Sequence, residues 1–277
     1  MNRNRKSSNA LPLKARETLR QLARAAQSGL VTVQDAAKLF GYPQSIMATR
    51  LARLARQGWL TRARRGLYLV LPLESRPESP VAEDPWILAR VVYDPCYIGG
   101  WTAAEHWGLT EQLFRSTFVV TAANIRRRSE RILGAEFRLV RVAPARLRGT
   151  TLVWRGKERV AVSDRERTIA DALADPSWVG GVRQLIDIFV AYGASRERDL
   201  PKLLARIEEV NRGAVFKRLG FLAERVWPEA TEIREAALAR RTTGVIKLDP
   251  AVKARGRLNK RWGLWVNVSV PDQAARQ

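Results

Sequence analysis

The chain has 277 residues, of which 46% are hydrophobic. At about 100 to 200 residues per domain, this length indicates two globular domains. A total of 49 Lys and Arg against 27 Asp and Glu gives a net charge of +22, which favours a polyanionic partner. One Cys and one His exclude an internal disulfide and argue against a zinc site, so we expect no metal and no other cofactor. Because no apolar run is long enough for a signal peptide or a membrane span, we expect a cytoplasmic protein without a membrane partner.

The basic charge is concentrated near the start of the chain. Residues 1–75 hold 14 Lys and Arg against 3 Asp and Glu, a net charge of +11, and the other 202 residues carry the remaining +11. The segment 72–85 contains four prolines among acidic residues, a composition typical of an extended, solvated linker. We therefore predict a DNA-binding domain at 11–71, a proline-rich linker at 72–84 and a second domain at 85–270.

The apolar spacing in the first domain predicts a winged helix-turn-helix. Gly29 ends the first helix, Thr32 is a suitable N-cap for the second, and Gln44 or Ser45 is expected to cap the third. The turn at 63–66 contains Gly and two arginines, and it joins two short strands into the wing. The expected helices are 13–26, 33–40 and 44–57, and the expected strands are 59–62 and 67–70.

The third helix is the predicted reading element. Its inner face carries Met47, Leu51 and Leu54, which leaves a basic outer face, and Arg50 and Arg53 each offer two donors to a guanine. The wing arginines are better suited to phosphate contacts. A solvated helix face or a protein-binding winged helix are the alternatives, but the +11 charge favours nucleic acid. The predicted DNA-contacting residues are Gln44, Ser45, Thr49, Arg50, Arg53, Arg56, Arg62, Arg64 and Arg65.

The remainder of the chain predicts a mixed α+β domain in which short strands come first and a helical bundle follows. Ser163 is the expected N-cap of a helix that runs through Ala174. Arg126, Arg127 and Arg128 either extend the DNA footprint or lie in a solvated loop. The other expected helices are 85–92, 101–107, 178–192, 200–210, 214–226 and 229–240, and the expected strands are 116–121, 137–142, 151–154, 159–162 and, at the end of the chain, 262–270.

Five motifs in this second domain resemble the AbiEi family of antitoxins and occur in that family's order. They are YIGGWTAAEHWGLT at 97–110, VSDRERTIADAL at 162–173, GGV at 180–182, KRLGF at 217–221 and NKRWGLWVN at 259–267. Together with the winged helix they cover about residues 15–270. The antitoxin-domain motif residues that the resemblance singles out are Gly100, Trp101, Arg165, Glu166, Arg167, Asp171, Lys217 and Arg218.

The resemblance implies a transcriptional autorepressor and antitoxin of a bacterial two-gene system. Its partners would be double-stranded DNA, as the operator of its own promoter, and a cognate AbiEii-type nucleotidyltransferase toxin, with or without a stable complex. An antitoxin that enzymatically modifies its toxin and a stand-alone regulator without a toxin are the alternatives. We expect no catalytic residues, because the mixed charges at 164–167 are typical of a capped helix start and no Gly-rich phosphate loop occurs.

Overall fold

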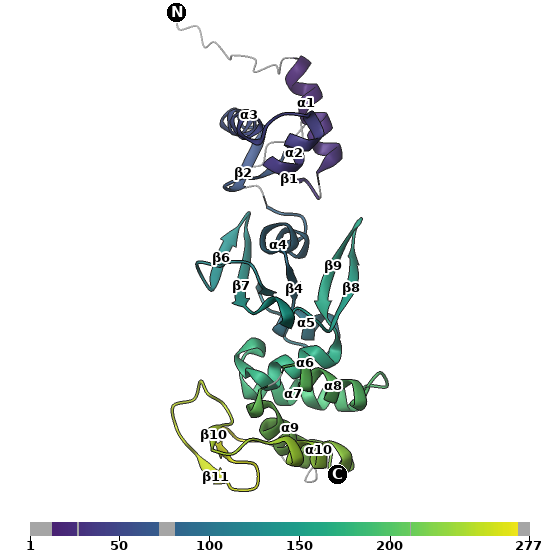
Figure 1. Cartoon of the computed structure of the whole chain (residues 1–277), viewed down its shortest axis with the longest axis vertical. Coiled ribbons are helices and arrows are strands. Elements are labelled where there is room, and N and C mark those ends of the chain that lie inside the picture. The colour runs from purple at the N-terminus through teal and green to yellow at the C-terminus, as the bar shows by residue number, and fades with distance from the viewer. Residues whose placement is uncertain (1–12, 27, 72–80, 211, 271–277) are drawn as a thin grey trace, which may run out of the picture. The chain divides into compact units, whose positions relative to one another are not determined.

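The computed structural model describes residues 13–26, 28–71, 81–210 and 212–270. The chain divides into two compact units, one formed by Met1–Val91 with Arg131–Ala135 and the other by Val92–Glu130 with Glu136–Gln277. Most of the linker predicted at 72–84 lies outside the described residues. The mixed α+β class is confirmed, since helices and sheets occur in both units (Figure 1).

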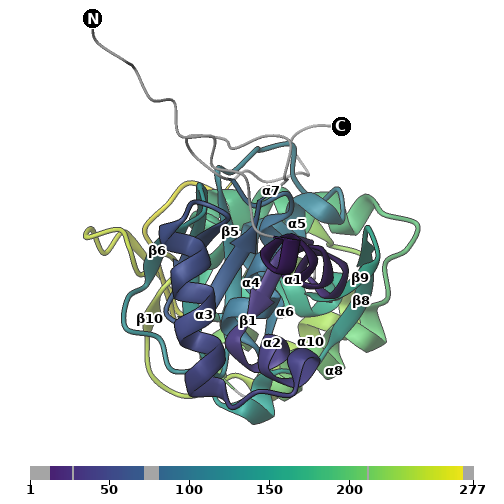
Figure 2. The same cartoon turned by 90° about the horizontal axis from the view of Figure 1, so that it is seen from above.

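The N-terminal unit contains the predicted winged helix-turn-helix. Its helices are visible together in Figure 2, and its strands form one antiparallel sheet in the order β1-β3-β2. The stretch before the second helix is a strand, so the predicted hairpin gains a third member. The elements are α1 (Leu13–Ala25), β1 (Leu30–Thr32), α2 (Val33–Phe40), α3 (Gln44–Arg56), β2 (Leu60–Arg64) and β3 (Leu67–Val70).

The caps of these helices match the sequence at one position and differ from it at another. Thr32 caps α2 as predicted, because its Oγ1 accepts a hydrogen bond from the Asp35 backbone N–H at 3.0 Å. The predicted capping of α3 by Gln44 or Ser45 is wrong. Pro43 is the N-cap, without a side-chain hydrogen bond, and α3 begins at Gln44. Proline's fixed φ suits a helix start, but its ring carries no acceptor for the free N–H groups of the first turn.

The second unit is built around a six-stranded mixed sheet in the order β6-β7-β5-β4-β9-β8. Strand β4 runs antiparallel to β5 and parallel to β9, whereas β5 and β7 run parallel. Two of these strands, β4 and β6, were not predicted, since strands of three and four residues are too short to show a clear alternation. The strands are β4 (Cys96–Ile98), β5 (Ser116–Thr121), β6 (Ser129–Ile132), β7 (Ala135–Arg141), β8 (Thr150–Arg155) and β9 (Glu158–Ser163).

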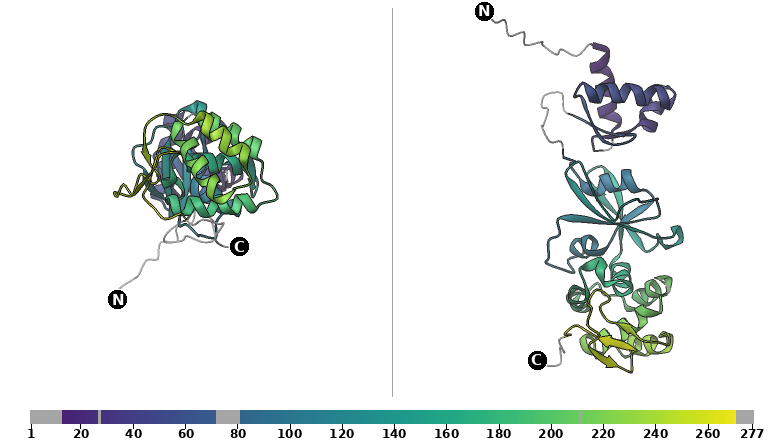
Figure 3. Two further views of the ribbon diagram at one scale, coloured as in Figure 1. Left: turned by 90° about the horizontal axis from the view of Figure 1, so that it is seen from below. Right: turned by 90° about the vertical axis from the view of Figure 1, so that its left-hand side faces the viewer.

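Helices and a small terminal sheet complete this part of the chain, and the right-hand view of Figure 3 shows the helical layer next to one end of the six-stranded sheet. The short elements are η1 (Pro144–Arg146), η2 (Pro176–Val179), β10 (Ile246–Lys247), β11 (Arg257–Asn259) and β12 (Leu264–Val266). The helices are α5 (Gly100–His106), α6 (Arg165–Ala174), α7 (Val182–Ala194), α8 (Leu200–Val210), α9 (Gly213–Val226) and α10 (Thr231–Arg240). Helix α4 (Pro85–Tyr93) belongs to the N-terminal unit except for its last two residues.

Three sequence predictions for the second unit are corrected. Ser163 is the last residue of β9, and Asp164 caps α6 by accepting from the Arg167 backbone N–H at 2.7 Å. The helix predicted at 178–192 is divided into η2 and α7, because Gly180 and Gly181 both adopt positive φ angles between them. The strand predicted at 262–270 is confined to β12, which pairs with β10 and β11.

Helix α9 and the terminal sheet pack so closely that a glycine is required between them. A Cβ atom at Gly220 would lie 2.0 Å from the ring of Trp262, a distance that no side chain tolerates. Trp262 is fully buried, and its indole N–H donates to Glu224 Oε2 at 2.6 Å. The motifs at 217–221 and 259–267 are therefore the two sides of one contact. Within the described part of the chain, none of the helices is long and apolar enough to cross a lipid bilayer.

Candidate DNA interface and the buried motif network

The two faces of α3 differ in burial as the sequence predicted. Met47, Leu51 and Leu54 are buried in the core of the N-terminal unit. Arginines follow on the outside of the same helix, and the predicted polar residues occupy its first two turns. All six of these predicted contacts on α3 are exposed, namely Gln44, Ser45, Thr49, Arg50, Arg53 and Arg56.

Arg50 is held by a contact that the sequence analysis missed. Its guanidinium carbon lies 4.0 Å from the centre of the Tyr42 ring, in the turn between α2 and α3. Such a cation–π contact restricts a long side chain while leaving its N–H groups available. In the sequence, the only indication of this contact was the aromatic residue in the turn before α3. Next to Arg50, the Thr49 hydroxyl donates to the Ser45 carbonyl one turn earlier at 3.1 Å, which directs the hydroxyl along the helix.

A groove of about 410 Å³ runs between α1 and α3. Arg50 and Arg53 both line it, together with apolar residues of the unit's core, whereas Arg56 does not. The basic face of α3 is therefore divided. Arg50 and Arg53 share one side of the helix, and Arg56 lies apart from them in the last turn.

The wing adds three exposed arginines. Arg62 and Arg64 alternate with less exposed residues along β2, and Arg65 lies in the turn before Gly66. The pairing of β2 with β3 shifts between Arg62 and Arg64, which is a bulge. Bulges bend a strand and redirect its side chains. The structure thus places basic side chains on both α3 and the wing of one small unit.

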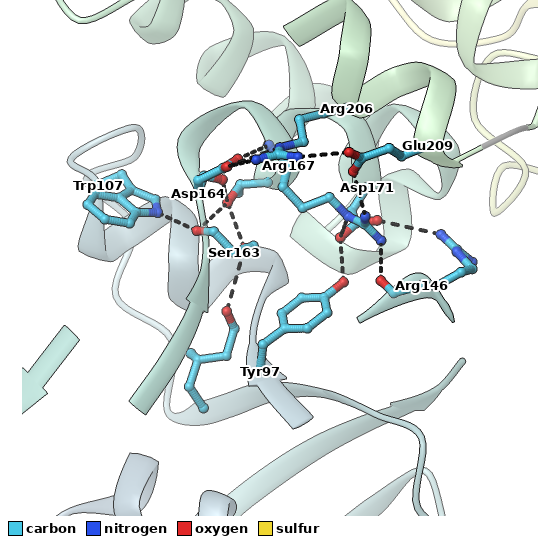
Figure 4. A network of polar contacts seen from close by, with 11 residues as sticks. Tyr97, Trp107, Arg146, Ser163, Asp164, Arg167, Asp171, Arg206 and Glu209 are labelled. Carbon is cyan, nitrogen blue, oxygen red and sulfur yellow. Dashed lines mark hydrogen bonds and ion pairs between the residues drawn. The ribbon is translucent and has the colours of Figure 1, made fainter. Parts of the chain in front are cut away.

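Two of the antitoxin-domain motif residues of α6, Arg167 and Asp171, form a polar network in the interior of the second unit (Figure 4). Arg167 and Asp171 are each only 1% exposed, and the Arg167 Nε donates to Asp171 Oδ2 at 3.0 Å. Tyr97 from β4 donates its hydroxyl to the same carboxylate oxygen at 2.7 Å. Arg167 also donates to the Arg146 carbonyl at 2.9 Å, and the Arg146 guanidinium lies 3.5 Å from Asp171 Oδ1. One carboxylate therefore connects β4, η1 and α6.

Burial and the neighbouring charges shift the pKa values of Asp171 and Arg167 in opposite directions. Burial raises the pKa of Asp171, and the neighbouring Arg167 and Tyr97 oppose that rise only in part. Burial alone would lower the pKa of Arg167, but Asp171 and Tyr97 reverse this and raise it. Burial and the nearby carboxylate both raise the pKa of Tyr97 well above its ordinary value. At neutral pH the phenol stays protonated and donates to the carboxylate.

The start of α6 is tied to α8 by further ion pairs. Asp164, the N-cap, accepts from the Arg206 guanidinium at 2.9 and 3.1 Å. Glu166, which is 2% exposed, lies 2.7 Å from Lys202 Nζ and accepts from the Tyr192 hydroxyl at 3.1 Å. Arg165 differs from its neighbours because it faces outward, pairs with the exposed Glu197 and stacks on Trp107.

Lys217 and Arg218 of α9 are also buried, and both donate hydrogen bonds to backbone carbonyls. Arg218 donates to the carbonyls of Leu173 and Leu248 at 2.9 Å each, so it joins the end of α6 to β10. A cation at a helix C-terminus satisfies carbonyls that lack partners within the helix. Burial lowers the pKa of Arg218 to about 10. Lys217 Nζ donates to the Gly244 carbonyl at 2.6 Å.

Gly100 and Trp101 belong to the junction of β4 and α5. Gly100 has a φ of +52°, and a Cβ there would lie 2.4 Å from the Trp178 carbonyl oxygen. Trp101 is half-buried, stacks on Phe114 with ring centres 5.0 Å apart, and donates its indole N–H to the Ser116 carbonyl at 2.8 Å. Both residues are explained by packing.

Comparison with known proteins finds a family similar to the N-terminal unit. Residues 17–70 match the family described as "Transcriptional regulator, AbiEi antitoxin". This confirms the AbiEi resemblance over the winged helix, while the five C-terminal motifs lie beyond the match. The comparison with curated proteins returns no match.

A solved structure shares the fold over most of the chain. The RV2827C protein from Mycobacterium tuberculosis aligns with a TM-score of 0.58 at 17% identity, covering 92% of each chain. At 17% sequence identity, this similarity shows a shared fold and nothing about a shared function. The unit that matches the AbiEi model is thus followed by a second unit whose motif residues are mostly buried and mostly bonded to side chains or backbone carbonyls of that unit. Among the described residues, no group of three or more His, Cys, Asp or Glu is placed to hold a metal ion.

We predict that Asp171→Asn destabilises the second unit strongly, because Arg167 would keep a buried charge without its carboxylate. Removing one partner of a buried pair costs about 3 to 5 kcal/mol. Urea unfolding followed by tryptophan fluorescence measures this, since seven of the nine tryptophans belong to that unit. Arg165→Ala, at a half-exposed pair of the same motif, is the matched control and should cost about 1 kcal/mol or less. Equal losses for the two variants would show that the buried pair has no special role.

Proposed function

We propose that the protein is a sequence-specific DNA-binding autorepressor and the antitoxin of a bacterial toxin-antitoxin pair. The observation that carries the proposal is the exposed arginine face of α3 beside an arginine-bearing wing, in a unit that matches AbiEi-type transcriptional regulators. In a winged helix the second helix of the motif enters the major groove. The operator would be double-stranded DNA in the protein's own promoter, and the site of action would be the cytoplasm.

The positions of the arginines support a division between base reading and backbone positioning. Arg50 and Arg53 lie one turn apart on the same side of α3, where each guanidinium fork matches the O6 and N7 acceptors of a guanine. Arg50 has less freedom, because Tyr42 lies under it. The wing arginines extend from a strand and a turn and are suited to phosphates, whose contacts carry no sequence information directly.

We further propose that the second unit counters an AbiEii-type nucleotidyltransferase toxin without chemically modifying it. Support comes from the five AbiEi-like motifs, all of which belong to that unit. Most of their charged residues are engaged in the interior, as Arg167 is with Asp171 and Arg218 is with backbone carbonyls. Groups held in this way stabilise a scaffold and are not positioned to attack a substrate.

We predict that Arg53→Ala and Arg65→Ala weaken DNA binding in different ways. Loss of a bidentate base contact at Arg53 should cost about 1 to 3 kcal/mol on operator DNA and much less on random DNA. Loss of a phosphate contact at Arg65 should weaken binding to both DNAs by similar factors and flatten the salt dependence by about one unit. Titrations of both variants on both DNAs at several salt concentrations measure these effects. If the wing variant lost sequence preference and the helix variant lost only general affinity, the assignment would be inverted.

We predict that repression and toxin neutralisation can be separated in the full-length chain. The double variant Arg53→Ala/Arg65→Ala should lose repression of a promoter reporter but still rescue cells that express the cognate toxin, because both substitutions lie on the exposed surface of the N-terminal unit. Failure to rescue at wild-type protein levels would mean that DNA binding is required for neutralisation. The mass of toxin purified from rescued cells should equal that of toxin produced alone, and an added mass would favour an enzymatic antitoxin.

A further inference from the structure

The second unit contains a pocket whose lining residues are not among the predicted DNA contacts of α3 and the wing. Its volume is about 430 Å³, and its walls come from β5, the loop after β5, β7 and η2. All of these residues belong to the same unit. The lining residues are Phe118, Ile125, Arg126, Arg127, Arg128, Arg138, Leu139, Val140, Arg141, Asp175, Ser177 and Trp178.

The charge of this arginine pocket is strongly unbalanced. Five of its lining residues are arginines and one is acidic. The acidic residue, Asp175, is occupied locally, because its Oδ1 accepts from the Ser177 backbone N–H at 3.1 Å and hydroxyl at 2.7 Å. Over residues 13–26, 28–71, 81–210 and 212–270, none of the five arginines forms an ion pair, and Arg138 has only a 3.5 Å contact with the Ser129 hydroxyl. Like charges gathered without counter-charges repel one another, so an anion in the pocket would be stabilising.

The backbone holds these arginines together. Arg138 lies beside Phe118 in the parallel pairing of β7 with β5, and Arg141 lies beside Thr121 at the end of the same pairing. The loop that carries Arg126 to Arg128 is fixed to β7, because the Leu139 backbone N–H donates to the Arg128 carbonyl at 2.8 Å. The loop arginines are thus anchored at one end to the strand that supplies the others.

The shape and chemistry of the pocket favour a small anion with phosphate groups over an unpaired base or a DNA duplex. Guanidinium groups bind phosphate oxygens through pairs of parallel N–H donors. Phe118 and Trp178, with 1% and 6% exposure, form an apolar wall but expose too little ring surface to stack an unpaired base. A volume of about 430 Å³ falls within the range of small-molecule sites and does not admit a DNA duplex.

We propose that the arginine pocket binds a small polyphosphate anion of the nucleoside triphosphate class. The linked phosphates would lie among the arginines of the loop and β7, where several charge-assisted hydrogen bonds can form at once. This site shares no residue with the α3 and wing surface, and the proposal does not depend on whether that surface binds DNA.

Isothermal titration of the full-length protein with ATP, GTP and inorganic tripolyphosphate at about 0.15 M salt tests the proposal, because weak surface attraction is screened under these conditions. We expect one site per chain. Arg126→Ala/Arg127→Ala, which removes two exposed loop arginines, and Arg138→Gln in β7 should each weaken binding at least tenfold, the usual effect of losing a hydrogen bond between charged groups. Arg148→Ala/Arg196→Ala removes two exposed arginines of the same unit outside the pocket and should change affinity less than about twofold.

Comparing tripolyphosphate with ATP and GTP shows whether the pocket recognises the phosphates alone or the nucleoside as well. Equal affinity for tripolyphosphate and nucleotide would support recognition of the phosphates alone, whereas tighter nucleotide binding would support recognition of the nucleoside as well. The absence of binding, or wild-type affinity in both pocket variants, would overturn the proposal. It would also be overturned if Arg53→Ala/Arg65→Ala abolished polyphosphate binding, because the anion would then occupy the DNA-binding surface.

Discussion

The buried ion pair between Arg167 and Asp171 is the interaction on which the second unit depends. A charge that is almost fully enclosed is tolerated only if its partners are in place, since an unpaired buried charge costs several kcal/mol. Here the partners come from β4 through Tyr97, from η1 through Arg146 and from α8 through Glu209, whose carboxylate lies 3.8 Å from Arg167. Correct folding of the network therefore requires the sheet and the helices to meet in one arrangement.

The need of buried charges for nearby partners also explains why the AbiEi-like motifs contain many charged residues. The run at 162–173 includes the N-cap of α6, the pair that connects it to the sheet, and residues that α8 neutralises. Arg218 then satisfies carbonyls at the other end of α6. Several charged residues of these motifs thus cap, pair with or anchor α6. The exposed arginines of the N-terminal unit and the arginines of the pocket are left for external anions.

The sequence predicted the parts of the structure that local patterns determine. Alternating burial on α3, the Thr32 cap and the hairpin of the wing all follow from spacing within a few residues. It did not predict that the charged residues of α6 are buried, because their partners are distant in the chain. Tyr97 and Asp171 are separated by 74 residues, and Arg206 and Asp164 by 42. The arginine pocket was not predicted either. The sequence indicated a loop at Arg126 to Arg128, but it gave no sign that this loop lies against β7.

Hydrogen exchange of the full-length protein, with and without its promoter DNA, tests most directly the claim that the N-terminal unit reads DNA while the motif network is a scaffold. The account predicts that DNA slows exchange of backbone amides in α3 and the wing and leaves residues 162–173 unchanged, because those amides are already enclosed in the free protein. Protection centred on residues 162–173, with none in α3, would contradict it.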